Sequence, residues 1–127
     1  MTTRDLKSNI DIVASLAPAA RTATASGGGA DLRGYESAVV AFVPGTVTDG
    51  THTPSVEESD DDSTYTAVAA ADLLGSLAAL ASNVVQRVGY RGGSRYIRAK
   101  ITVTGATTGA LDAALVIRGN AARQPLA

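Results

Sequence analysis

Turn-forming clusters rich in glycine, aspartate and serine recur along the chain and divide it into short segments. The clusters are SGGGAD (26–31), PG (44–45), TDG (48–50), SDDDS (59–63), GYRGGS (89–94) and TGATTG (104–109). Most of them separate short runs of strand-forming residues. Because this spacing of turns is typical of sandwiches and barrels, the sequence predicts an all-β fold.

Two of the runs alternate with the period of a β-strand. In RYIRAKITV (95–103), one face carries Ile97, Ala99, Ile101 and Val103, and the other carries Tyr96, Arg98, Lys100 and Thr102. In ALDAALVIRG (110–119), one face carries Leu111, Ala113, Leu115 and Ile117, and the other carries Asp112, Ala114, Val116 and Arg118. Side chains that alternate in this way predict two strands, joined by a hairpin loop at TGATTG.

A third run, YESAVVAFVPG (35–45), is apolar at every position from Ala38 to Val43. Both faces of this strand should therefore be covered. Either the strand is central to a sandwich, or its outer face meets another subunit. Pro44 ends it, because proline cannot donate to the ladder.

The length of 127 residues predicts one domain. We expect a single antiparallel β-sandwich, jelly-roll-like, over residues 18–119. Residues 1–17 are interpreted as an N-terminal arm, either a short helix or extended, and residues 120–127 as an irregular tail. AAADLLGSLAAL (69–80) has leucines at helical spacing but a central Gly75, so we expect at most a short helical turn there.

Composition argues against several classes of protein. The net charge is −1, whereas nucleic-acid-binding domains usually carry a basic face. The chain has no cysteine, which excludes disulfides, thiolate metal sites and a cysteine nucleophile. The N-terminus lacks the apolar region of a signal peptide, and no run is long enough to cross a membrane. We expect no membrane association and no cofactor.

Residues 45–68 contain the only histidine, His52, and the densest acidic run, EESDDD (57–62). Clustered carboxylates suit calcium, but the spacing of a calcium loop is absent. Aspartate and serine side chains that bond back to nearby amides are typical of turns, so we interpret the run as a hairpin turn, with no metal site. No GxSxG elbow accompanies His52, and a hydrogen bond within a loop is the simpler role for it than catalysis.

Two further segments each have a structural and a functional interpretation. The triple glycine at 27–29 lacks the GK[ST] ending of a phosphate loop and is interpreted as a flexible linkage. RVGYRGGSRYIRAK (87–100) interleaves basic residues with tyrosines, which can hold single-stranded nucleic acid. Because the acidic run lies in the same small domain, we favour protein contact or internal ion pairing.

Four phrases together resemble a family of small proteins from tailed phages and prophages. They are LAPAARTATASG, DLRGYESAVVAF, TDGTHTPSVEESDDDSTYTAVAAADLLG and VQRVGYRGGSRYIRAKITVTGATTGA, and they lie between residues 16 and 110. The resemblance as a whole covers roughly residues 16 to 124. Genes of this family commonly lie among head-morphogenesis genes, close to the major capsid gene. The resemblance implies a non-enzymatic virion structural protein, most plausibly a capsid decoration (cement) protein.

The resemblance further implies the major capsid protein as partner, a homo-oligomer with a trimer favoured, synthesis in the host cytoplasm and a final location on the capsid exterior. From the arm, the apolar strand and the basic run, we expect contacts with subunits or capsid at Leu6, Ile10, Ile12, Val13, Val40, Phe42, Arg91 and Arg95. The alternatives are a head–tail connector or tail component, and a carbohydrate-binding sandwich. A hydrolase using His52 is a further rival.

Overall fold

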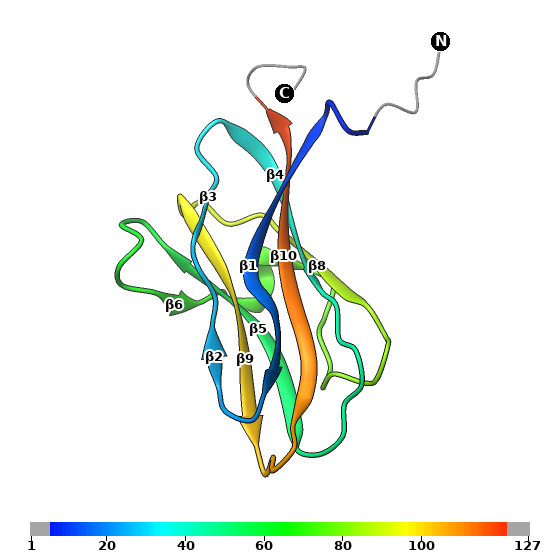
Figure 1. Ribbon diagram of the computed structural model, residues 1–127. Coiled ribbons are helices and arrows are strands. Elements are labelled where there is room, and N and C mark those ends of the chain that lie inside the picture. Colours follow the sequence, from blue (N-terminus) through cyan, green and yellow to red (C-terminus); the bar gives the residue numbers. More distant parts are fainter. Residues whose placement is uncertain (1–5, 122–127) are drawn as a thin grey trace.

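The computed structural model describes residues 6–121, and it is a sandwich of two antiparallel sheets (Figure 1). Sheet A has the order β1-β10-β4-β8-β7, with bounds Ile10–Arg21, Ala110–Ala121, Tyr35–Phe42, Gln86–Tyr90 and Leu73–Leu74. Sheet B has the order β2-β9-β5-β6, with bounds Ala25–Ser26, Tyr96–Thr104, Thr51–Ser59 and Thr66–Ala67. The short β3 (Ala30–Asp31) also pairs with β9. The prediction of an all-β sandwich is confirmed.

The strands pair from the outside of the sequence inward. β1 pairs with β10, β2 and β3 pair with β9, β4 pairs with β8, and β5 pairs with β6. Successive pairs lie alternately in the two sheets, as when one long antiparallel ribbon is rolled up. This is the connectivity of a jelly roll, so that part of the prediction is also confirmed.

The core lies between the sheets and is filled by inward-pointing residues of the long strands. Val40 and Phe42 of β4 and Ile97 and Ile101 of β9 are fully buried. In β9 the buried face is the apolar one predicted from alternation, together with Ala99. β4 has a neighbour on each side in sheet A, which fits the interpretation of the apolar run as an interior strand.

The leucine- and alanine-rich segment 69–80 forms one helical turn, as expected. The turn is η1 (Ala70–Asp72), a 3₁₀ helix that β7 follows directly. Gly75 has φ +108°, a conformation that a continuing helix would not permit. Leu80 is buried, and Leu73 and Leu77 pack against the core. The three leucines therefore all contact the core, although the segment that carries them is irregular and not a helix.

The predicted boundary between arm and sandwich at residue 17 is corrected by β1. Residues 10–21 pair with β10 from Ile10↔Gly119 to Arg21↔Ala110, and the two strands run side by side along the sandwich in Figure 1. Backbone pairing makes residues 10–17 part of sheet A, because without them β10 would be an unpaired edge. Residues 1–5 of the arm lie outside the described residues. The predicted tail also begins later, because β10 continues to Ala121.

The triple glycine is an ordered connection between the sheets, which corrects its interpretation as a flexible linkage. Gly27 N–H donates to the carbonyl of Ala99 in β9 (2.8 Å), and Gly28 N–H donates to the carbonyl of Ser15 in β1 (2.8 Å). A Cβ added at Gly27 would lie 2.5 Å from the carbonyl oxygen of Ser15. Only glycine permits this close approach without a shift of the backbone.

The acidic run forms the predicted turn between β5 and β6. The carboxylate of Asp61 accepts hydrogen bonds from the backbone N–H groups of Ser63 and Thr64, each at 2.9 Å, and from Ser59 Oγ at 2.8 Å. These bonds hold the pKa of Asp61 below its usual range. Asp62 adopts φ +57°, which aspartate tolerates in tight turns. Within residues 6–121 no cluster of histidine and acidic side chains suits a metal ion.

Candidate interaction surface

The outer face of sheet A is apolar across all five strands. Strand registers place Ile12, Ile117, Val39, Gly89 and Leu74 in a single row from β1 to β7. Because this row alternates with core residues such as Val40 and Val116, the side chains of Ile12, Ile117, Val39 and Leu74 point away from the core. Ile12 is 52% exposed and Leu74 is 55% exposed. We call this outer surface the apolar face.

The next rows continue the apolar face toward the other end of the sheet. Ala14, Leu115, Ala41 and Arg87 form the second row, in which only Arg87, near the sheet margin, is charged. Beyond it, Val43 and Ala113 exchange backbone hydrogen bonds at 2.8 and 3.1 Å, and Leu111 is 53% exposed. The apolar character therefore extends along much of β10.

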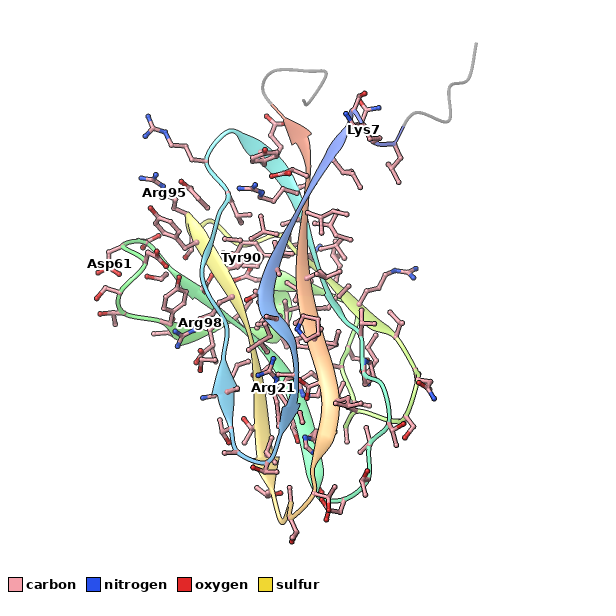
Figure 2. All side chains as sticks on the ribbon, viewed as in Figure 1. Lys7, Arg21, Asp61, Tyr90, Arg95 and Arg98 are labelled. Carbon is pink, nitrogen blue, oxygen red and sulfur yellow. The ribbon has the colours of Figure 1, made fainter. Side chains whose placement is uncertain are left out.

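β10 turns its larger apolar side chains outward and its charged side chains inward. Asp112 is 3% exposed and forms an ion pair with Arg21 at the end of β1 (Figure 2). Arg118 forms an ion pair with Asp11 and stacks on the ring of Tyr35 (4.5 Å). This is the reverse of the pattern expected when an outer sheet face is solvated.

The outer face of sheet B has the ordinary polar composition. Its cross-strand pairs include Thr53↔Thr102, Ser55↔Lys100 and Glu57↔Arg98. Arg98 donates to Glu57 at 2.8 Å and stacks on the ring of Tyr65 at 4.0 Å. Internal pairing of the basic run with the acidic run is therefore confirmed for Arg98, and Lys100 lies 3.9 Å from the same Glu57.

A cleft of about 760 Å³ lies at one end of the sandwich, beside the apolar face. Its walls are the turn between β3 and β4, the start of β4, β7 and the loop after β8. Val39, Gly89 and Leu74 belong to both surfaces, so the cleft is continuous with the apolar face. The charged residues that line it are Arg33, Glu36, Asp60, Arg91 and Arg95.

Arg95 is held by a carboxylate of its own chain. Its Nε and Nη2 donate to the two oxygens of Asp31 at 2.9 and 2.8 Å, and Figure 2 shows Arg95 at the start of β9. The hydrogen bond from Arg95, with another from the Arg33 backbone, lowers the pKa of Asp31 from 3.8 to about 2. Arg91 instead donates through Nε to the carbonyl of Ala71 (3.1 Å). Both arginines are exposed.

The structure separates the predicted contact residues into three groups. Val40 and Phe42 are corrected, because both are fully buried in the core and have no surface to offer a partner. Arg91 and Arg95 are brought together in the cleft. The remaining four lie in β1 or just before it. Leu6, which precedes β1, and Ile12 are exposed, Ile10 is partly buried, and Val13 packs against the core.

The sequence analysis missed the outward residues of β10 and β4, and the residue that directly follows β4: Leu111, Leu115, Ile117, Val39 and Val43. Alternation in 110–119 grouped the first three on one face, but it did not show that this face points out of the sandwich.

His52 is no candidate for acting on a diffusing substrate. It lies at the start of β5 with its side chain inside the sandwich and no exposed surface. Its Nε2 hydrogen-bonds the carbonyl of Asp49 at 3.0 Å, as the simpler interpretation predicted. A general base must come within hydrogen-bonding distance of a substrate, which this burial prevents.

The four tyrosines are engaged within the chain. Guanidinium groups lie over the rings of Tyr35, Tyr65 and Tyr96. Tyr90 is 7% exposed, and its hydroxyl donates to Glu58 at 2.6 Å and accepts from the backbone of Ser94 at 3.0 Å. Stacking on a sugar ring requires a free aromatic face, so these contacts disfavour the carbohydrate-binding alternative.

The fold is similar to that in the crystal structure of PBSX exported protein XepA. The two align with a TM-score of 0.59 and 20% sequence identity, over 97% of this chain and 40% of that chain. This chain therefore spans less than half the length of XepA, and at this identity the likeness shows the fold alone. No protein-family model and no curated protein matches the sequence. Within the described residues, no helix has the length and apolar character needed to cross a membrane.

Proposed function

We propose that this protein is a non-enzymatic structural protein of a tailed-phage virion that decorates the capsid by binding the lattice of the major capsid protein. It would be made in the bacterial cytoplasm and reside on the capsid exterior. It would act as a rigid body that adds contacts to the shell.

The observation that carries the assembly role in this proposal is the outward orientation of the apolar residues of β10. Leu111, Leu115 and Ile117 point out of the sandwich, while Asp112 and Arg118 point into it. A domain that acts alone in water gains nothing from this arrangement, whereas a component of an assembly buries such a face against its partners.

A resemblance of sequence supports a phage origin, and a likeness of fold is compatible with it. The four phrases of sequence resemble small head-region proteins of tailed phages. The fold is similar to that of PBSX exported protein XepA.

We assign the contact with the shell to the end of the sandwich that holds the cleft. Arg33 and Arg91 are exposed there, and Leu6, 62% exposed, precedes β1. Arginine side chains suit an acidic surface on the capsid protein, because guanidinium groups bind carboxylates with two parallel hydrogen bonds. Binding to assembled shells alone would stabilise them by mass action, and many copies would reinforce one another.

Co-sedimentation with shells that lack this protein tests the proposal. Wild-type protein should pellet with mature shells, and Arg91→Glu should bind at least about tenfold more weakly, because it places a like charge against the acidic surface. Thr53→Glu is the matched control, since it adds the same negative charge to the outer face of sheet B. Failure of the wild-type protein to bind shells, combined with labelling of the tail, would assign it to the connector or tail instead.

A further inference from the structure

The apolar face of sheet A is one continuous surface with a definite size. β1, β10 and β4 span about 10 Å from axis to axis, and Leu111 to Ile117 spans about 20 Å along β10. With the side chains included, the apolar face covers roughly 300–400 Å², comparable to the largest apolar patches on monomeric proteins, which are often functional. Arg87, near its margin, is the one charged residue among the rows described above.

The composition of the face limits what covers it. If solvent covered the outer face, the favourable arrangement would place Asp112 and Arg118 outside and Leu115 and Ile117 inside. A shift of the β10 register by one residue would produce that arrangement. Instead, the chain uses Arg21 and Asp11 to neutralise the inward charges. Burying charges is costly even when they are paired, and the exposed surface of the outward apolar residues of β10 contributes no compensating burial within a single chain.

We infer that the apolar face is covered by the same face of a second copy of this chain, forming a twofold dimer. Two flat sheet faces pack at a spacing of about 10 Å, as they do inside a sandwich. The other large sheet surface in the described part of the chain is the outer face of sheet B, whose pairs are threonine with threonine, serine with lysine and glutamate with arginine. A head-to-tail contact would therefore bury charge against leucine and isoleucine, whereas a self-complementary contact would not.

This inference deepens the proposed function, because it reserves the apolar face for self-association and leaves the end with the cleft for the shell. It also replaces the expected trimer by a dimer, since a self-complementary face is satisfied by two copies. A standard interface uses about 800 Å² per partner, about twice the area of this face. We therefore expect a weak dimer, with a dissociation constant of roughly 10 µM to 1 mM, which crowding on a shell would populate.

Sedimentation velocity on the purified full chain, without particles, tests the dimer from about 1 µM to about 2 mM, a range that brackets the expected affinity. Wild-type protein should pass from monomer to dimer across this range. Ile12→Glu and Leu111→Glu, at opposite ends of the face, should each weaken the dimer at least about tenfold, because each buries an unpaired charge. Both side chains are more than half exposed, so the melting temperature should remain close to that of the wild type.

Thr53→Glu on sheet B is the matched control and should dimerise like the wild type. A wild-type protein that stays monomeric throughout the range would overturn the inference, as would a dimer that both variants on sheet A leave unchanged. If the monomeric protein lost shell binding through Ile12→Glu, the apolar face would belong to the capsid protein. Sedimentation velocity uses no shells, so a negative result would contradict the dimer without contradicting the proposed location on the capsid.

Discussion

Ser15 in β1 and Ala99 in β9 are 84 residues apart in the sequence, and a hydrogen bond joins them across the two sheets. The backbone N–H of Ala99 donates to Ser15 Oγ at 2.9 Å, and Ser15 Oγ in turn donates to the carbonyl of Gly28 at 2.9 Å. Ser15 is 7% exposed, so water does not readily replace either bond. One hydroxyl group therefore ties β1, β9 and the glycine segment together.

Removing this hydroxyl should destabilise the sandwich. Ser15→Ala leaves the buried N–H of Ala99 without a partner, which costs about 1–3 kcal/mol of unfolding free energy, and it removes the hydrogen bond to the exposed Gly28. Chemical denaturation followed by circular dichroism measures the change. Thr102→Ala, an exposed residue on the same β9, is the control and should change stability by less than about 0.5 kcal/mol. Equal effects of the two substitutions would contradict this role of Ser15.

Adjacent glycines in the same segment should respond differently to alanine. Gly27→Ala places a Cβ 2.3 Å from Ser15 Oγ and 2.5 Å from the Ser15 carbonyl oxygen, so the backbone must move. We expect a loss of about 1–3 kcal/mol or more, typical of overpacking. Gly28→Ala meets no atom within 4 Å and should be neutral or stabilise the fold by up to about 1 kcal/mol, through the unfolded chain. Thermal melting of both variants measures this difference. A Gly27→Ala variant as stable as the wild type would show that the glycine segment is not held against Ser15.

The Asp31–Arg95 pair should give stability a specific dependence on pH. The pKa of Asp31 is lowered from 3.8 to about 2 in the folded protein, so the unfolded chain takes up this proton more readily. The stabilisation is therefore fully present above about pH 4 and is lost as pH falls toward 2. Because both side chains are substantially exposed, at 42% and 39%, we expect only a small contribution to stability from the pair.

Urea unfolding of wild-type protein and Asp31→Asn at several pH values measures this contribution. The variant should be less stable near pH 7, and the difference should shrink between pH 4 and pH 2, as linkage requires. Arg95→Gln should change stability in the same direction but by less, because the backbone N–H of Arg33 still donates to Asp31. A difference between wild type and Asp31→Asn that grew on acidification would show that the sign of the linkage is wrong.

Where the sequence obeyed a period of two without interruption, its interpretation was reliable. Residues 96–104 form β9 with the predicted faces, and the turn at 59–63 lies where it was expected. The predicted hairpin at 104–109 is wrong, because β9 pairs with β5 in sheet B whereas β10 pairs with β1 and β4 in sheet A, so this loop connects the two sheets. β1 was ambiguous because register shifts between Ala14 and Leu16, and again between Leu16 and Ala19, interrupt its period. Ser15 and Leu16 are consequently both buried, which no alternating pattern predicts.

The apolar face was the part of the site that the sequence could not place. Alternation in β10 separated two faces correctly but left open which one enters the core. The answer depends on Arg21 and Asp11, which are 91 and 107 residues away from their partners Asp112 and Arg118. Similarly, Val40 and Phe42 were assigned to a contact surface because every residue of their run is apolar, and only the register shows that Val39 occupies the outer face.

The location of the protein on the particle is the most direct test of the account. Electron cryomicroscopy should be performed on intact virions of the phage or prophage that encodes it, and on particles from which the gene has been deleted. The proposal predicts density on the outer surface of the capsid that fits the two-sheet sandwich, with the cleft end toward the shell, and loss of that density from the deletion particles. Density confined to the tail or connector, or particles without this protein, would contradict the proposed role in capsid decoration.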